Sequence, residues 1–298
     1  MAQAPATPKT RRAALLAAAS ISSSRARTLA RSPSEGAALD LRAAQRGRAM
    51  PRAEEVIFLV PLVSPEHVGD WAAVSERLAQ TIESFRRQAG PWQAVICCQQ
   101  RPPLPDDPRL HWLPFEDPTP GNDKWRKLAT LYDHLSQVAT RPALVMSFDA
   151  DDLLRDGTVE RMLSAPAPGW LVEDGYVMDH ATGDVALAGA RSLSQPLRKP
   201  FWKLCGSCAA ILHDPALPQS AAFLKAMTQH EHRMFPYLAR LAGRPLQALT
   251  PPAVLYVLNH GENFGARRGR VGFKTRFVQR FALPEKDWAR VSDEFASP

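Results

Sequence analysis

Short apolar runs alternate with amphipathic segments through the middle of the chain. In 70–85 and 122–138 the apolar residues recur three and four positions apart, which predicts one buried helical face in each. The apolar runs around them are rich in Val, Ile, Leu, Phe and Cys, as in strands covered on both faces. This β-α-β-α-β order predicts an α/β fold, a Rossmann-like doubly wound mixed sheet with right-handed crossovers. The predicted strands are 56–64, 93–98, 110–115 and 142–148.

The second half of the chain has a different pattern. GWLVEDGYVMDHATGDVALAG (169–189) is typical of a hairpin with the turn HATGD, and FWKLCGSCAAIL (201–212) predicts a further strand. Helical patterns follow near 221–228 and 231–242, before the apolar run AVLYVLNHGENFG. No internal repeat is present. We expect a single domain over 54–265 and a separate tail over 266–298.

The first 53 residues differ in composition from the rest. They hold ten Lys and Arg residues against two acids, so the formal net charge of +7 falls to −1 in the remaining chain. The basic balance therefore does not indicate a nucleic-acid partner. The Ala-, Arg- and Ser-rich composition is typical of a transit peptide, and TRRAALLAAASISSSRA has features of a bacterial export signal. We favour a disordered or mis-assigned leader over 1–53, with translation starting near Met50, because a short Ala-rich run makes a poor signal core.

Four cysteines lie in two apolar, strand-like stretches, as Cys97-Cys98 and Cys205-x-x-Cys208. Neighbouring residues on a strand point to opposite faces, so Cys97 and Cys98 do not readily bind one ion. A zinc or redox role stays open for the C-x-x-C pair, but buried reduced thiols are the simpler interpretation. Reduced thiols, and the lack of a run of about 18 apolar residues, favour a cytoplasmic protein.

The segment LVMSFDADDLL (144–154) carries the most informative polar residues. Asp149, Asp151 and Asp152 follow a predicted buried strand, and the first two would face the same way in an extended chain. Ligands of doubly wound sheets bind at this carboxyl edge. Clustered carboxylates repel one another unless a cation lies between them, and oxygen ligands suit Mg²⁺ or Mn²⁺. The alternative is that Asp151 or Asp152 caps a following helix.

Three cations crowd the first turn of the helix predicted over 122–138. Lys124, Arg126 and Lys127 oppose the helix dipole there. They are either solvated surface residues or partners of an anionic ligand.

Strand, FDADD and helix in this order resemble the Asp-x-Asp motif of nucleotide-sugar glycosyltransferases with the glycosyltransferase-A fold. The resemblance covers roughly residues 55–265, and the start of this region is similar to that of family-2-like members. FLVPLVS precedes a helix that ends in TIESFRRQ, NDKWRKL comes just before the motif strand, and LCGSCAAIL takes the place of the acceptor-side segment. The resemblance implies a metal-dependent, hexosyltransferase-type enzyme of polysaccharide biosynthesis. Its substrates would be a nucleoside-diphosphate sugar donor and a glycan or lipid-linked acceptor.

The resemblance also implies roles for individual residues. Asp149 and Asp151 would contact the ribose and the metal diphosphate, and His260 in LNHGEN would be a further ligand of Mn²⁺ or Mg²⁺. The family usually presents an acidic pair as the base, whereas this chain has only Glu231, flanked by two histidines. Glu231 is our candidate for the base, with a histidine or a group elsewhere as alternatives. Candidates for nucleotide and phosphate contacts are Asp123, Lys124, Lys127 and Asp149.

The tail has a cationic, amphipathic pattern. The segment from Asn263 to Pro284 contains six Lys and Arg residues and no acid, and its apolar residues recur at helical spacing. The segment could lie on an anionic membrane surface at the inner face, bind the donor diphosphate, or cover the core.

Two other functions compete with glycosyl transfer. One is a degenerate homologue that binds a nucleotide or glycan without turnover. The other is a haloacid-dehalogenase-type phosphatase, with Asp149 as nucleophile and Asp151 as acid.

Overall fold

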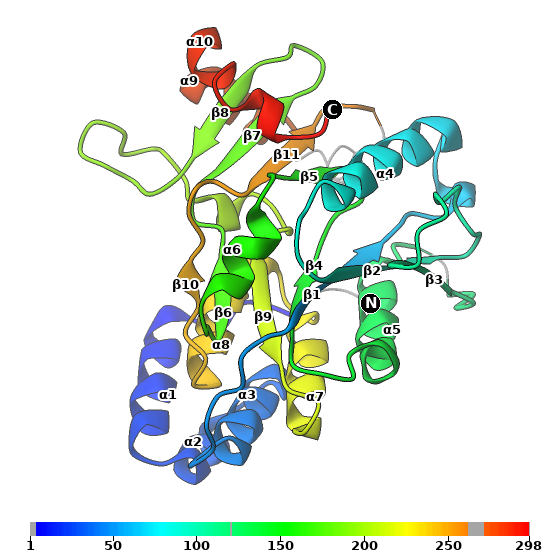
Figure 1. Ribbon diagram of the computed structural model, residues 1–298. Coiled ribbons are helices and arrows are strands. Elements are labelled where there is room, and N and C mark those ends of the chain that lie inside the picture. The colour runs from blue at the N-terminus through cyan, green and yellow to red at the C-terminus, as the bar shows by residue number, and fades with distance from the viewer. Residues whose placement is uncertain (1–3, 120, 262–270, 298) are drawn as a thin grey trace.

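A computed structural model describes residues 4–119, 121–261 and 271–297 (Figure 1). Its centre is a mixed sheet, in which seven strands of the described residues follow the order β10-β6-β9-β4-β1-β2-β3. β1, β2, β3 and β4 are parallel, and β9 runs antiparallel to both β4 and β6. The predicted α/β, doubly wound mixed sheet is therefore confirmed. The strands are β1 Glu55–Pro61, β2 Trp92–Cys98, β3 Leu110–Pro114, β4 Ala143–Ser147, β6 Gly169–Leu171, β9 Ala209–His213 and β10 Gln247–Ala248.

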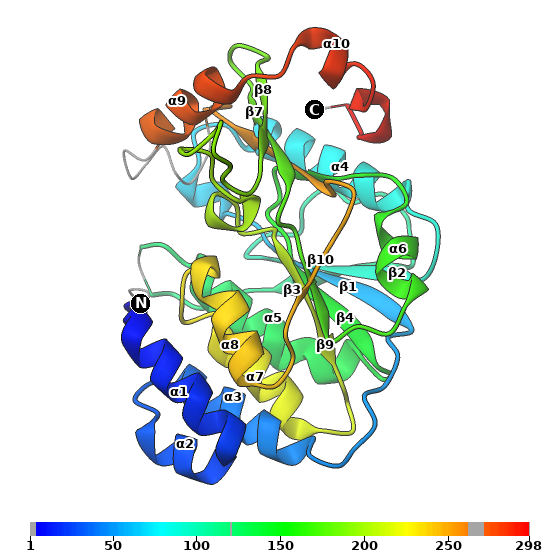
Figure 2. The same cartoon turned by 90° about the vertical axis from the view of Figure 1, so that its left-hand side faces the viewer.

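Helices cover both faces of this sheet, with α7 and α8 on one face and α6 on the other (Figure 2). α4 begins after Asp70, whose carboxylate accepts the Ala73 N–H at 3.0 Å, as expected for an N-cap. Its apolar stripe is buried, and the ring of Phe85 stacks on that of Phe58 in β1 at 4.1 Å. The helices predicted over 70–85 and 122–138 are thus present. The helices on the two faces of the sheet are α4 Trp71–Arg86, α5 Lys124–Val138, α6 Thr158–Ser164, α7 Pro218–Met227 and α8 Phe235–Leu241.

A smaller sheet, in the order β5-β11-β7-β8, stands beyond the carboxyl ends of the parallel strands. The predicted hairpin is present as β7 and β8, although β6 at its start joins the large sheet instead. α9 packs on β7 and β8 and buries Phe277 and Val278, so this part of the tail covers the core. The elements are β5 Asp152–Leu154, β7 Gly175–Asp179, β8 Val185–Ala188, β11 Val254–Leu258, α9 Val271–Phe281 and α10 Glu285–Trp288.

The N-terminal segment is folded, which corrects the expectation of a disordered leader. α1 (Lys9–Ile21), α2 (Ser23–Leu29) and α3 (Pro33–Ala44) pack together, α3 also packs on α7 and α8, and α1 packs on α8. The Ala-rich pattern does not indicate a core segment by itself, because its weak apolar stripe is buried only when these distant helices supply the other side. Within the described ranges, no helix combines the length and apolar character needed to cross a bilayer. The buried apolar side chains of the N-terminal helices include Leu15, Ala19, Ala26, Leu39 and Leu41.

A buried carboxylate joins the N-terminal helices together. Glu35 accepts hydrogen bonds from Thr7 at 2.8 Å and from Arg11 at 3.0 Å, and Tyr237 of α8 donates to it at 3.3 Å. Burial alone would raise the pKa of Glu35, but these donors and the Arg31 N–H outweigh it and lower the pKa. The segment is therefore held by specific polar contacts as well as by apolar packing.

His213, the last residue of β9, should make the stability of the protein sensitive to acid. Burial, and then the charge of Arg244, lower the pKa of His213 to about 4, against about 6.5 in an unfolded chain. Between these values the unfolded state binds more protons, so stability is lost as the pH falls from 6.5 toward 4. Wild type should lose free energy of unfolding between pH 7 and pH 5, and in His213→Leu this loss should be smaller by about 2 kcal/mol. Urea unfolding at both pH values measures it, and an unchanged pH dependence would contradict the assignment.

Candidate functional site

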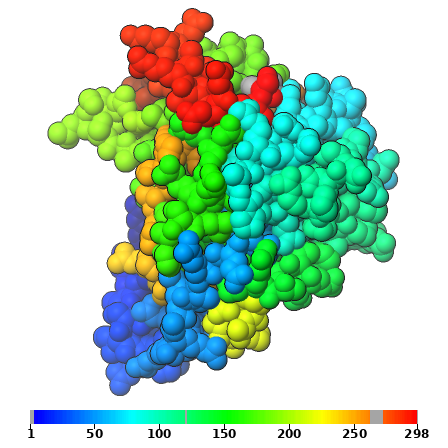
Figure 3. All heavy atoms as spheres, in the orientation of Figure 1, coloured from blue at the N-terminus to red at the C-terminus, as the bar shows by residue number. Residues whose placement is uncertain are grey.

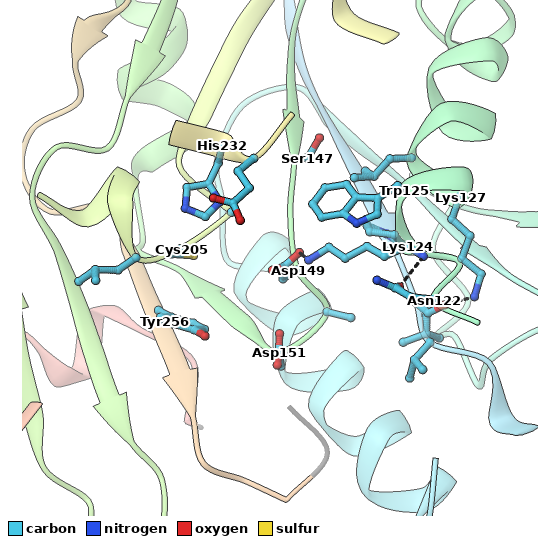
Figure 4. Close-up of a pocket in the computed structure, with 18 of the residues that line it drawn as sticks. Asn122, Lys124, Trp125, Lys127, Ser147, Asp149, Asp151, Cys205, His232 and Tyr256 are labelled. Carbon is cyan, nitrogen blue, oxygen red and sulfur yellow. Dashed lines mark hydrogen bonds and ion pairs between the residues drawn. The ribbon is translucent and has the colours of Figure 1, made fainter. Parts of the chain in front are cut away.

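The aspartate motif lies in a turn at the carboxyl edge of the large sheet. β4 ends at Ser147, and the Asp152 N–H donates to the Asp149 carbonyl at 3.2 Å, so the motif is not extended as predicted. Asp149 and Asp151 still both line one cavity of about 510 Å³ (Figure 4). β5 follows directly, and α6 starts only after Gly157, which has a φ of +74°. Neither Asp151 nor Asp152 therefore caps a helix.

Asp149 is paired with the first residue of α5. Lys124 Nζ donates to Asp149 Oδ1 at 2.6 Å, and the Lys124 N–H donates to Asn122 Oδ1 at 3.1 Å. Burial lowers the pKa of Lys124, but the carboxylates of Asp149 and then Asp151 outweigh it, so the pKa is raised. The cavity thus contains a fixed ammonium group beside the motif, as expected for a residue that contacts an anionic ligand.

The neighbouring cations of α5 have partners within the protein. Lys127 is fully buried, with Nζ 2.8 Å from an Asp123 carboxylate oxygen and 2.6 Å from the Leu62 carbonyl that it donates to. Arg126 lies 2.7 Å from Asp117. Asp123 and Lys127 also line the cavity, but their charges neutralise each other, so their contact with the nucleotide stays a prediction. The hydrogen bond from Lys127 to the Leu62 carbonyl joins the start of α5 to the residue that follows β1, and so helps to position Lys124.

The second motif carboxylate meets the predicted histidine. His260 follows β11, and its Nε2 lies 2.9 Å from Asp151 Oδ2, across 109 positions of sequence. Burial would raise the pKa of Asp151, but the hydrogen bond and charge of His260, and then Lys124, lower it. The adjacent Asn259 has a φ of +64° and donates to Asp179 at 2.9 Å, which holds the turn after β11. The tertiary structure thus brings Asp149, Asp151 and His260 to one cavity.

The geometry fits a divalent cation held by two protein ligands better than one held by three. The described residues contain no group of three or more His, Cys, Asp or Glu side chains that could hold an ion by themselves. Asp151 Oδ2 and His260 Nε2 are an oxygen and a nitrogen donor 2.9 Å apart, a spacing that suits neighbouring ligands of one ion. Mg²⁺ commonly uses one or two carboxylates and takes substrate phosphates for its other positions. Asp149, bound to Lys124, remains only a predicted ligand.

The third aspartate of the motif, Asp152, is bonded to the CGSC loop. Asp152 is fully buried, and its Oδ2 accepts hydrogen bonds from Ser207 Oγ at 2.5 Å and Cys205 Sγ at 3.0 Å. Ser207 Oγ in turn accepts the Asp149 N–H at 2.8 Å. Burial, and then the charges of Asp151 and Asp149, raise the pKa of Asp152 well above its usual value. The Asp152 carboxyl group therefore ties the motif turn to the CGSC loop, a contact that the sequence pattern did not predict.

The cysteines match the simpler interpretation. All four are free and buried. Burial raises the pKa of Cys205 and Cys208, which keeps both as thiols.

Of the candidates for a base, two reach the cavity. Glu231 and His232 line it, at the start of the short 3₁₀ turn His232–Met234. Burial, and then the charges of Lys274 and Arg233, lower the pKa of His232 to about 4, so its imidazole is neutral near pH 7. His230 instead points toward the N-terminal helices, where Nε2 lies 2.6 Å from Ser34 Oγ.

The sequence pattern singles out neither of two residues on the opposite wall, although binding of the donor diphosphate by the tail is one of its expectations. Lys274 of α9 donates to the hydroxyl of Tyr256 on β11 at 2.5 Å, and both side chains line the cavity. Burial lowers the pKa of Lys274 and raises that of Tyr256. The only signal in the sequence was the acid-free tail, because nothing local shows that Lys274 returns to the motif. The cavity thus has cations on two sides of its carboxylates.

Comparison with known proteins leaves this site without an assigned activity. No family model matches the chain, and no curated protein matches it. Among solved structures, it is similar to the crystal structure of 4-diphosphocytidyl-2C-methyl-D-erythritol synthase, with a TM-score of 0.33 and 13% sequence identity. The match covers 75% of this chain and 99% of that chain. A likeness of this size carries no conclusion about chemistry, so the function has to be argued from the site.

Proposed function

We propose that this protein transfers a sugar from a nucleoside diphosphate to a glycan or lipid-linked acceptor. One observation carries the proposal: Asp149 and Asp151 lie together in a cavity of about 510 Å³ at the carboxyl end of β4. In doubly wound sheets, ligands bind where the strand order reverses. Here that point lies between β1 and β4, because β2 and β3 continue on one side and β4 starts the other.

The donor would lie on the α5 side of the motif. The end of β1 and the start of α5 form this wall of the cavity, and Lys124 is the cation of this wall that lies beside the motif. An ammonium group held beside the site can bind a diphosphate without further reorganisation. The buried Asp123–Lys127 pair keeps this wall in place when substrate enters.

A divalent cation on Asp151 and His260 would act as a Lewis acid toward the leaving diphosphate. The remaining work falls to side chains of the chain itself. Asp149 and Asp151 orient the donor, and Lys124 and Lys274 contribute positive charge on two sides of the cavity. These fixed charges stabilise the negative charge that develops as the bond to the sugar breaks.

The acceptor would enter from the side of Glu231. A carboxylate in the cavity can take the proton of an acceptor hydroxyl as its oxygen attacks the sugar. Glu231 lines the cavity and is the candidate for this role. His232 stays neutral near pH 7 because of its low pKa and is the alternative.

Calorimetric titration with UDP-, GDP-, CDP- and dTDP-sugars tests the proposal. We expect one nucleotide class to bind, with higher affinity in Mn²⁺ than in EDTA, because the cation links the diphosphate to Asp151. Transfer is then followed as release of nucleoside diphosphate with candidate acceptors. Binding without release for any acceptor would favour the degenerate homologue. Phosphatase activity without nucleotide affinity would contradict both.

A further inference from the structure

Several segments of the chain contain cations and no acid, among them 185–213 and 263–284. From 185 to 213 there are four Lys and Arg residues, and from 263 to 284 there are six. Beyond residue 53 the chain has 27 Lys and Arg residues and 28 acids, so these two segments take ten of the cations and none of the acids. Such a separation of charge produces a local positive potential that the net charge does not indicate.

The fold brings the described parts of these segments together. The loop 189–200 leaves β8 and returns beside α9, which packs on β8. Lys199 Nζ lies 3.8 Å from the ring centroid of Phe273, and Arg198 and Arg280 line one small hollow between loop and helix. We call the loop 189–200 and residues 272–281 of α9 the basic corner. Its loop projects from the body of the molecule (Figures 1 and 3).

Apolar side chains are exposed in the basic corner. Leu193 at the tip of the loop is fully exposed at 104%, Leu197 is 52% exposed and Phe273 is 43% exposed. They are three of the six large apolar residues that the described part of the chain leaves exposed. A folded chain gains nothing from leucines held in water at the tip of a projecting loop.

Several cations in the loop and directly after it lack acidic partners. Among the described residues, no carboxylate forms an ion pair with Arg191, Lys199 or Lys203. Of the cations on the N-terminal helices, Arg11 and Arg27 do pair with acids. Burial, and then neighbouring cations, lower the pKa of Lys199 and of Lys203. The positive charge of the basic corner is therefore available to an external anion.

The basic corner also borders the cavity. Lys203, Phe273 and Lys274 belong to the cavity wall, on the side away from Lys124. A surface that bound the basic corner would lie beside the entrance on this side.

We propose that the basic corner docks the protein on an anionic phospholipid membrane, with Leu193 and Leu197 entering the interface between head groups and acyl chains. Unpaired cations around exposed apolar side chains are the combination that binds such an interface. A nucleic acid or an acidic glycan would use the cations but not the leucines. The docked orientation would present a lipid-linked acceptor to the cavity. That last statement rests on the proposed function, whereas docking itself does not.

Vesicle co-sedimentation of the full chain tests the proposal. Wild type should sediment with vesicles of phosphatidylcholine and phosphatidylglycerol, and not with phosphatidylcholine alone. Leu193→Asp with Leu197→Asp should lower the partition coefficient at least about tenfold. Arg191→Glu with Arg276→Glu is the second variant and should act in the same direction. The matched control is Ile21→Asp with Leu29→Asp, which alters two exposed apolar residues at the other end of the molecule and should leave binding unchanged.

Three outcomes would overturn docking through the basic corner. These are equal binding to neutral vesicles, equal loss in the control variant, and unchanged binding after both leucines are replaced. Competition by heparin or an oligonucleotide, together with no effect of the leucines, would indicate a general polyanion site instead. Sugar-nucleotide binding is measured on the same variants and should stay at the wild-type level. If wild type binds vesicles but no sugar nucleotide, the proposed function fails and the docking surface stands.

Discussion

Asp149→Asn and Asp151→Asn should each reduce kcat/KM for sugar transfer by about 10²–10³-fold. Both substitutions keep the shape of the side chain and remove a charge that faces the cavity. Asp149→Asn also removes the negative charge that Lys124 contacts at 2.6 Å. Asp151→Asn removes the carboxylate charge beside His260, whose Nε2 lies 2.9 Å from Asp151 Oδ2. We therefore expect Asp151→Asn to lower the advantage that Mn²⁺ gives to nucleotide binding more than Asp149→Asn does.

The control for these variants is Asp106→Asn, an exposed aspartate of the loop before β3. It should keep wild-type kcat/KM and nucleotide affinity. Urea unfolding of all three proteins separates loss of chemistry from loss of folding. Full transfer activity in both site variants, with unaltered nucleotide affinity, would remove the basis of the proposed function.

A protein that starts at Met50 should fail to unfold cooperatively, because it loses α3 from the surfaces of α7 and α8 and α1 from that of α8. The single substitution Leu39→Ala measures the same contact in a chain that can fold. Leu39 is 1% exposed in this contact, so we expect a loss of about 2–5 kcal/mol in the free energy of unfolding. Chemical denaturation measures it. The loop of Glu231 should also be affected, since His230 contacts Ser34 of α3 at 2.6 Å.

Ile21→Ala is the control for this prediction, because Ile21 lies on the same helices but is 80% exposed. Its effect should stay within about 0.5 kcal/mol. A chain from Met50 that folds with wild-type stability would show that the N-terminal helices are not part of the core. Equal effects of Leu39→Ala and Ile21→Ala would lead to the same conclusion.

The large sheet was predictable because its elements carry their own periodicity. β1, α4, β2, α5 and β4 each bury a face or a whole run, so the apolar pattern alone locates them. The reversal of strand order next to β1 then places the carboxyl end of β4 at the binding edge. Asp149, Asp151 and Lys124 could be assigned to a common site on this basis.

The sequence pattern failed where a residue's partner lies far along the chain. Lys124 and Lys127 lie in the same stretch of sequence, yet Lys127 is fully buried on Asp123 of its own helix start, whereas Lys124 is partly exposed and pairs with Asp149 of the motif. Asp152 differs from Asp151 by one position, and it turns away from the cavity to accept a hydrogen bond from Ser207. Which side of a turn each side chain takes depends on packing between β4, β5 and the CGSC loop, and no local pattern contains that information.

Local periodicity and polar spacing were thus sufficient for the α/β core and for an acidic edge on it. They were not sufficient for the N-terminal helices, the return of Lys274 to the cavity, or the meeting of Asp151 with His260 across 109 positions. The physical reason is the same in each case. A strand or helix can be predicted from the spacing of its own apolar residues, whereas a site is made of groups from separate segments. Their pairing becomes favourable only after the core has brought those segments together.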